Sequence, residues 1–386
     1  MGYITHSVSV NLAPLLFACL KRTYDLSLGY LAAFTLVTFV VQIIMDISAA
    51  AFMEKVSFRA LAVISQLLSG MGLMLLGVLP LVMRPEVGLL IAAVIYSSGG
   101  GLSEVLLSPL VEALPHETGS SSLSILHSFY SWGHVAVILI TTGVLGILGD
   151  ALWFLVPILW SLIPFWCARR FATVPMPEMT CHEEGLGMGQ LFKCKAFALL
   201  LLMMFCSGSA EQIMAQWSSY YAEVGLGVPK VTGDLVGPCI FALMMALGRT
   251  LYGNSGGKLR IKTTLTLSAI VTFICFVAAV FVRLPLGSLI SLGLSGMGIS
   301  LMWPGILSLA REQYRGGGAS MFAVLAFGGD VGCSVGPFLT GIVSERMENT
   351  DTALRCGILT GAIFPMIMLV GVVMISIAAK RKKQAQ

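Results

Sequence analysis

The stretch RRFATVPMPEMTCHEEGLGMGQLFKCK, residues 169–195, divides the chain into two similar halves. It is the longest polar segment of the 386 residues, and it contains two prolines, three glutamates and four Lys or Arg residues. Long apolar runs lie on both sides of it. We therefore interpret 169–195 as a cytoplasmic linker between two groups of membrane-spanning helices.

Twelve apolar runs flank this linker. An α-helix needs about 20 mostly apolar residues to cross the hydrocarbon core of a bilayer. The first six runs cover residues 2–20, 27–52, 59–80, 87–113, 120–147 and 151–168, and the last six cover 196–222, 232–252, 263–282, 286–311, 317–344 and 354–379. The sequence predicts an all-α membrane protein of twelve transmembrane helices, in two pseudo-symmetric six-helix bundles at 1–168 and 196–386.

Composition and motifs exclude several other classes. Hydrophobic residues make up 57% of the chain and charged residues 11%, whereas soluble domains carry about 25% charged residues. The motifs HExxH and GxxxxGK[ST] do not occur, and the nine cysteines form no CxxC pair. No basic cluster is interleaved with aromatic residues. We expect no enzyme activity, no cofactor, no metal site and no nucleic-acid partner.

The distribution of Lys and Arg predicts the orientation in the membrane. If the linker is cytoplasmic, most of the 23 Lys and Arg residues fall in cytoplasmic segments, and Arg249 is counted among them as a loop residue. This bias places both termini in the cytoplasm. Because no targeting segment is visible, we expect the inner membrane of a bacterium.

The two halves also repeat a loop. AAFMEKVSFR at 50–59 follows the second apolar run, and GNSGGKLRIK at 253–262 follows the eighth, so that Lys55 aligns with Lys258. Weak internal symmetry between two six-helix halves is typical of secondary transporters.

This loop resembles a motif of the major facilitator superfamily, in which glycine, an acid, a base, a second glycine and basic residues follow one another. Glu54 matches the acid, Lys55 the base and Arg59 a later basic residue, while Ala50 and Ser57 stand in place of the glycines. The resemblance implies a twelve-helix transporter, usually monomeric, that exposes a site between its halves to each side of the membrane in turn.

A narrower resemblance covers the fourth and fifth runs. GGGLSEVLLSPLVEAL at 99–114 and LHSFYSWG at 126–133 resemble fucose-permease-like sugar symporters, with Glu104 five positions before Pro109. In that branch the glutamate is implied to bind sugar and proton. The branch also has an acid in its first helix, where this chain has Asn11.

Acidic residues inside the apolar runs are candidates for proton coupling. A charge at the bilayer centre costs roughly 2.5–3.5 kcal/mol on insertion scales, so each such residue needs a reason to be there. The candidates are Glu104, Glu211 and Asp330. The alternative for each is a hydrogen bond that only joins neighbouring helices.

Polar and aromatic residues on the same runs are candidates for solute binding, because histidines and amides bond hydroxyls and an indole can stack on a sugar ring. The candidates are Asn11, Glu104, His127, Tyr130, His134, Gln212, Gln216, Trp217 and Trp303, the last beside Pro304 where we expect a kink. Interhelical bonding or plain packing is the alternative. His127 and His134 lie roughly 10 Å apart along a helix, too far to share one metal ion.

A further group lies near the linker-side ends of the runs, and we interpret it as a gate lock. Its members are Asp46, Glu54, Lys55, Arg59, Glu112 and Lys258. We predict proton-coupled symport of a small polar solute such as a monosaccharide. A proton-coupled exporter of amphipathic compounds is the first alternative, and a non-transporting membrane receptor or intramembrane enzyme the second.

Overall fold

The structure is a computed structural model that describes residues 1–53, 56–112, 119–176, 195–254, 260–314, 318–347 and 350–384. In these ranges the chain forms helices and contains no strand. The linker centre, 177–194, lies outside the described residues, as do Glu54, Lys55 and Lys258.

Six long helices form the first half. They are α1 (Gly2–Tyr24), α2 (Leu28–Met53), α3 (Phe58–Val82), α4 (Pro85–Glu112), α5 (Gly119–Leu148) and α6 (Leu155–Thr173), with a short turn of 3-10 helix, η1 (Asp150–Leu152), before α6. Each covers one of the predicted apolar runs to within a few residues.

Six helical segments of the second half also match the predicted runs, but several are interrupted. They are α8 (Lys195–Tyr220) with η2 (Tyr221–Gly225); α9 (Lys230–Asp234), η3 (Leu235–Cys239) and α10 (Ile240–Asn254); α11 (Ile261–Phe281); α12 (Pro285–Ile299) with α13 (Met302–Gln313); α14 (Gly318–Glu345); and α15 (Thr350–Thr360) with α16 (Ile363–Gln384). Within the described ranges, eleven segments are long and apolar enough to cross a membrane. The shorter α6 completes the predicted twelve.

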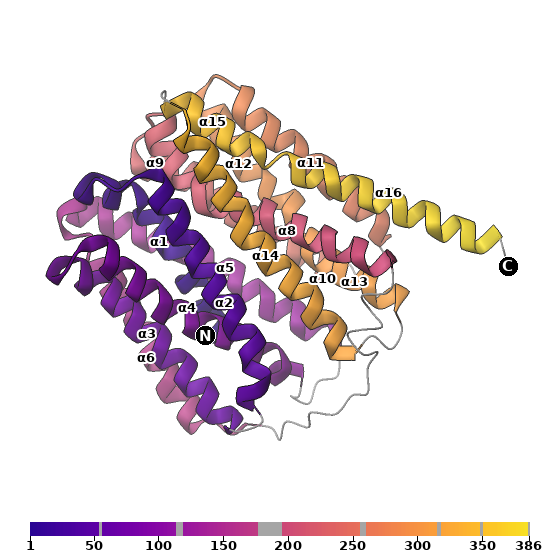
Figure 1. Cartoon of the computed structure of the whole chain (residues 1–386), viewed down its shortest axis with the longest axis horizontal. Coiled ribbons are helices and arrows are strands. Elements are labelled where there is room, and N and C mark those ends of the chain that lie inside the picture. Colours follow the sequence, from indigo (N-terminus) through magenta and orange to yellow (C-terminus); the bar gives the residue numbers. More distant parts are fainter. Residues whose placement is uncertain are drawn as a thin grey trace.

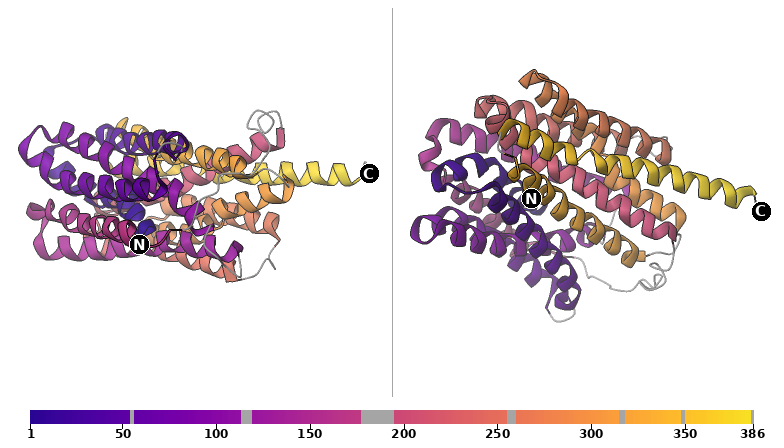
Figure 2. Two further views of the ribbon diagram at one scale, coloured as in Figure 1. Left: turned by 90° about the horizontal axis from the view of Figure 1, so that it is seen from below. Right: turned by 45° about the horizontal axis from the view of Figure 1, so that its top comes forward.

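The helices of each half lie together (Figure 1). In the first half α3 packs on α4 and α6, and α1 packs on α5; in the second, α8 packs on α14 and α11 on α12. The halves meet where α2 contacts α14, α5 contacts α10 and α1 contacts α8. Two further views show the same grouping, with α16 reaching beyond the other helices (Figure 2).

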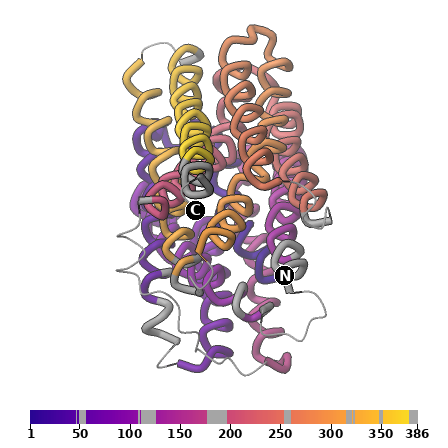
Figure 3. The backbone as a smooth tube through the Cα atoms, turned by 90° about the vertical axis from the view of Figure 1, so that its right-hand side faces the viewer, coloured from indigo at the N-terminus to yellow at the C-terminus, as the bar shows by residue number. Residues whose placement is uncertain are grey.

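The molecule has two ends along its helices. The linker end is the end where α6 stops at Thr173 and α8 begins at Lys195. The far end is the opposite one, where α1 stops at Tyr24. The backbone tube shows most of the second half, in orange and yellow, above most of the first half, in indigo and violet (Figure 3).

Close backbone contact fixes α8 against α14. A Cβ on Gly208 would lie 2.1 Å from the carbonyl oxygen of Gly329, and one on Gly332 would lie 2.0 Å from that of Phe205. Only glycine permits such an approach, which is how small residues join helices in lipid. The polar side chains of α8 are thereby held beside α14.

The helix α1 runs through the centre. Its residues are buried from Gly2 to Leu20 apart from Ile4, including its polar side chains. A helix buried on all faces packs against other helices and not against lipid. Its polar groups must therefore find partners inside the protein.

Candidate functional site

Polar side chains from both halves meet near the middle of the helices. We call this group the central polar layer. Its members are His6, Asn11, Gln42, Glu104, Tyr130 and Ser131 from the first half, and Glu211, Gln212, Gln216 and Arg249 from the second, together with the backbone carbonyl of Ser300. Nearly all of them are buried.

Asn11 and Tyr130 meet in the first half. The Asn11 amide nitrogen lies 3.1 Å from the Tyr130 hydroxyl and donates to the Ser7 carbonyl at 3.0 Å. Among the described residues, the Asn11 Oδ1 has no hydrogen-bond partner although it is buried. Two predicted residues are thus brought together, and one acceptor remains available.

Glu104 lies between two side chains that the sequence analysis missed. Its Oε2 accepts from Gln42 Nε2 at 2.5 Å and lies 3.4 Å from His6 Nε2. His6 Nδ1 lies 3.2 Å from the Gly100 carbonyl, which can only accept, so that nitrogen carries a hydrogen. His6 Nε2 can then bond Glu104 only if one more proton sits on either partner. The geometry suits a shared proton.

The position of Arg249 differs from the one predicted from the sequence. Arg249 had been counted as a loop residue at the linker side, but it lies inside α10, with its side chain 10% exposed and paired with Glu211 at 3.1 Å. Its second terminal nitrogen donates to Ser131 of the first half at 3.1 Å. An arginine can lie this deep because a carboxylate from α8 neutralises it. The local signal was an arginine preceded by the apolar stretch FALMMALG.

A proline in α1 creates one contact between the halves. Pro14 has no N–H, so the carbonyl of Val10, four residues earlier, has no helical donor. The amide of Gln216 on α8 donates to this carbonyl at 3.2 Å. The same amide donates to Gln212 at 3.1 Å. Pro14 therefore opens an acceptor at the place where α1 meets α8.

A second proline acts in the same way. Pro304 leaves the Ser300 carbonyl without its helical donor, and Arg249 Nε donates there at 3.5 Å. The interruption expected near Trp303 and Pro304 is present: α12 ends at Ile299 and α13 begins at Met302.

Similarity to known proteins identifies the family. A family model described as Major Facilitator Superfamily matches residues 1–337. The chain belongs to the major facilitator superfamily. It is a membrane transporter and not an enzyme, as the sequence analysis predicted.

Solved structures of other transporters share its fold. A bacterial homologue of the human lysosomal transporter Spinster, inward-facing and occupied, has a TM-score of 0.77 at 13% identity, covering 97% of this chain and 94% of that chain. The nucleoside transporter NupG has 0.76 at 14%, covering 97% of each chain. The E. coli fucose:proton symporter FucP has 0.66 at 16%, covering 96% of each chain. None of the curated proteins matches in sequence.

Both tryptophans that were predicted to bind the solute are packed among apolar groups. Trp217 is fully buried, its Nε1 donates to the Pro337 carbonyl at 2.9 Å, and its ring lies 6.2 Å from that of Phe17. Trp303 packs on Gly329, where a Cβ would lie 2.2 Å from the indole. The structure does not bring either indole to a polar partner of the central layer, and their binding roles stay predictions.

Other predicted residues lie beside the transporter's central layer. His127 stacks edge-on against Tyr3 at 5.3 Å between ring centroids, and His134 lies 6.4 Å from Phe241. Among the described residues, His134 Nδ1 has no hydrogen-bond partner. Asp330 is buried on α14. In the part of the chain that the structure describes, no three His, Cys, Asp or Glu side chains form a group that could hold a metal ion.

The structure describes the side chain of one member of the predicted gate lock. Arg59 donates to the carbonyls of Phe171, Ala172 and Val174, at 3.1, 3.0 and 2.8 Å, and so caps the end of α6 within its own half. Asp46 and Glu112 lie in helices, but their side chains are outside the description, as are Glu54, Lys55 and Lys258 entirely. The gate assignment stays a prediction.

Proposed function

We propose that the transporter carries out proton-coupled symport of a small, uncharged polar solute such as a monosaccharide, bound at the central polar layer. One observation carries the proposal: the Glu104 carboxylate lies 3.4 Å from His6 Nε2, in a geometry that suits a shared proton. An acid inside the membrane-spanning region that gains and loses a proton during the cycle can couple solute movement to the proton gradient.

The charges of the layer favour an uncharged solute. Arg249 and Glu211 neutralise each other at 3.1 Å. A charged solute would disturb this balance in a region from which water is excluded. The groups that remain open, Asn11 Oδ1 and His134 Nδ1, suit the hydroxyls of a sugar.

Each predicted proton-coupling acid takes a distinct role in this proposal. Glu104 carries the proton together with His6. Glu211 holds Arg249 in place. Asp330 is the reserve candidate, and it is buried on α14. Two similar folds belong to a fucose:proton symporter and a nucleoside transporter, which are named for hydroxyl-bearing solutes.

The orientation belongs to the same proposal. We place the linker end in the cytoplasm of a bacterium and the far end outside the inner membrane. A proton gradient that is acidic outside would then drive the solute inward, and uptake would rise as the external pH falls.

The test uses purified protein in liposomes and a panel of labelled monosaccharides. Wild-type protein is expected to accumulate one of them above equilibrium when the outside is acidic. Glu104→Gln should equilibrate that sugar across the membrane without accumulating it. Glu86→Gln serves as the matched control, because Glu86 lies at the opposite end of the same helix.

Two results would contradict the proposal. Proton-driven accumulation by Glu104→Gln would remove Glu104 from the coupling step. If the protein bound no sugar of the panel at pH 5.5 or at pH 8, the sugar assignment would be wrong. The exporter of amphipathic compounds would then come first, because an apolar cluster of Val10, Phe39, Cys333 and Trp303 joins the two halves.

A further inference from the structure

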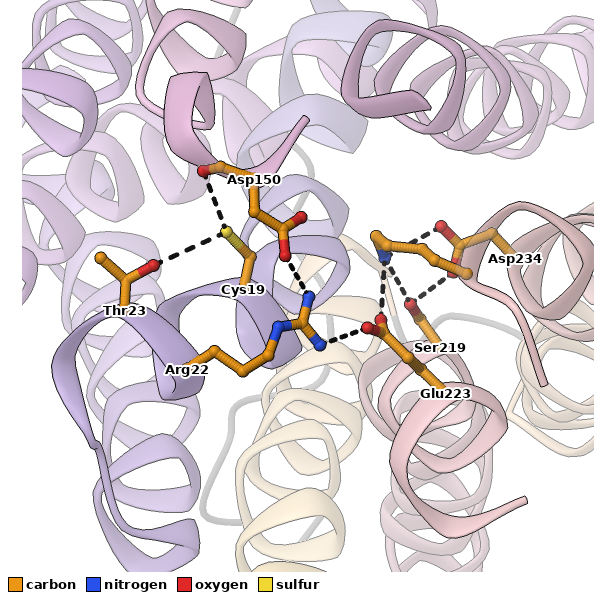
Figure 4. Close-up of polar contacts among 8 residues, drawn as sticks. Cys19, Arg22, Thr23, Asp150, Ser219, Glu223 and Asp234 are labelled. Carbon is orange, nitrogen blue, oxygen red and sulfur yellow. Dashed lines mark hydrogen bonds and ion pairs between the residues drawn. The ribbon is translucent and has the colours of Figure 1, made fainter. Parts of the chain in front are cut away.

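A second polar group connects the halves at the far end (Figure 4). We call it the far-end latch. Its charged members are Arg22 and Asp150 from the first half, and Glu223, Lys230 and Asp234 from the second. None of these residues was singled out in the sequence, and none belongs to the central polar layer.

Arg22 makes the first connection. It lies near the end of α1 and is 47% exposed. One terminal nitrogen pairs with Asp150 of its own half at 2.5 Å, and the other pairs with Glu223 in η2 of the second half. The guanidinium thus bridges an acid on each side of the boundary (Figure 4).

Asp234 makes the second connection. Its side chain is 1% exposed, and its Oδ2 accepts from Thr142 of the first half at 2.7 Å. Within its own half it accepts from Ser219 at 2.5 Å and pairs with Lys230 at 3.0 Å. The only one of these partners that lies in the other half is therefore the uncharged hydroxyl of Thr142.

The pairing has a consequence for separation of the halves. Arg22 would keep Asp150, while Glu223 and Asp234 would keep Lys230, whose nitrogen lies 3.8 Å and 3.0 Å from them. Separation at the latch therefore breaks one ion pair and one hydrogen bond, and it leaves none of the five charged residues of the latch without a partner. A buried charge left alone would oppose opening strongly. This arrangement avoids that penalty.

We propose that the far-end latch closes the far end of the transporter and opens in each transport cycle, with Asp150 as the partner that releases Arg22. Asp150 and Glu223 compete for one guanidinium. When Glu223 also holds Arg22 an ion pair joins the halves, and when Asp150 holds it alone only the hydrogen bond from Thr142 to Asp234 crosses the boundary at the latch. The latch concerns alternating access and does not depend on the identity of the solute or the coupling ion.

The competition predicts opposite effects for two similar substitutions. Glu223→Gln removes the acid on the far side of the boundary, so Arg22 stays with Asp150 and the open far end is favoured. Asp150→Asn removes the competitor, so Arg22 binds Glu223 more firmly and the closed far end is favoured. Both substitutions remove one negative charge and keep the size of the side chain.

The experiment measures the distance between two labels at the far end by pulsed electron resonance in nanodiscs. Labelled noncanonical residues replace Ile147 and Leu284, which are 85% and 74% exposed and lie in different halves. We expect the open-to-closed ratio to rise about two- to five-fold in Glu223→Gln and to fall by about the same factor in Asp150→Asn, the range expected for a partly exposed ion pair.

Asp25→Asn is the matched control, because Asp25 is an exposed acid just after α1. It should leave the ratio unchanged. Arg22→Gln gives a second, independent variant, and it should raise the ratio as Glu223→Gln does. The latch proposal would be wrong if Asp150→Asn and Glu223→Gln changed the open-to-closed ratio in the same direction, or if neither changed it. The measurement needs no solute or pH gradient, so its failure is separate from failure of the symport proposal.

Discussion

The central polar layer and the far-end latch both join the two halves, but they do so with different chemistry. In the layer, the ion pair of Arg249 and Glu211 lies within the second half, and each side chain is 10% exposed. The groups that cross the boundary there are neutral on one side, such as the Ser131 hydroxyl and the Val10 carbonyl. In the latch an ion pair itself crosses, and its Arg22 is 47% exposed.

This difference follows from the access of water. When a partly exposed ion pair separates, water replaces the lost partner, and such a pair is worth only about 0.2–1 kcal/mol. When a buried pair loses one member, about 3–5 kcal/mol is lost because the remaining charge has no partner. A protein whose halves part repeatedly can therefore place an ion pair across the boundary at a wet end, but keeps charge pairs within one half at its centre.

The largest expected effect comes from breaking the central pair. Arg249→Ala should leave Glu211 as an unpaired buried charge and lower the free energy of unfolding by about 3–5 kcal/mol. Thermal unfolding in detergent measures this loss, and Arg283→Ala, at an exposed far-end arginine, is the control. The double variant Arg249→Met with Glu211→Met should recover stability without recovering transport. Equal stability of Arg249→Ala and wild type would contradict the importance of the pair.

A smaller effect is expected from removing the neutral partner of Arg249 across the boundary. Ser131→Ala keeps the ion pair but removes a hydrogen bond to a charged group, worth about 1.5–3 kcal/mol. The open fraction reported by labels at Ile147 and Leu284 should rise, with little change in unfolding temperature. Ser161→Ala, which removes a hydroxyl bonded to Ile158 of its own helix, is the control. A lower unfolding temperature at constant open fraction would argue against a role at the boundary.

The proline contact should have a weaker effect. Pro14→Ala supplies an N–H that bonds Val10 within α1 and competes with Gln216 for that carbonyl. Loss of this one neutral bond should favour separation by about 0.5–1.5 kcal/mol, while α1 itself becomes more stable. The same labels report the shift, and Pro80→Ala tests a proline inside α3, away from the boundary. If both substitutions gave the same shift, the freed carbonyl would not be its cause.

The smallest expected effect is that of salt, which should act on the far-end latch and not on the central polar layer. Raising NaCl from about 0.02 M to about 1 M shortens the Debye length from roughly 20 Å to roughly 3 Å, which should weaken the exposed pair of Arg22 and Glu223 by less than about 1 kcal/mol. The open fraction of the wild type should rise slightly, and that of Glu223→Gln should not respond. The unfolding temperature of Asp25→Asn should follow the wild type at both salt levels.

The fold and part of the site could be predicted from the sequence. The bilayer requires an apolar helix of about 20 residues wherever the chain crosses it, and this requirement is local. All twelve predicted runs therefore coincide with helical segments. Asn11, Tyr130, Glu104, Glu211 and Gln216 were recognised as unusual for the same reason, because each is polar within an apolar run.

The missed residues had weaker local signals. His6 lies early in the first run, and Arg249 lies three residues before the predicted end of the eighth run, 232–252, where it was counted with the cytoplasmic basic residues. Arg22 and Asp234 lie near helix ends, where charged residues are ordinary. Nothing in their surroundings in the sequence distinguishes them from residues that contact only water.

The sequence by itself determined that this chain is a twelve-helix membrane transporter, since apolar length and charge content act residue by residue along the chain. Only the tertiary structure decided which polar groups are partners. His6 approaches the carbonyl of Gly100 across 94 positions, Arg249 reaches Ser131 across 118, and Arg22 reaches Glu223 across 201. Such pairs depend on the rotation and packing of whole helices, and that information is spread over every contact between them.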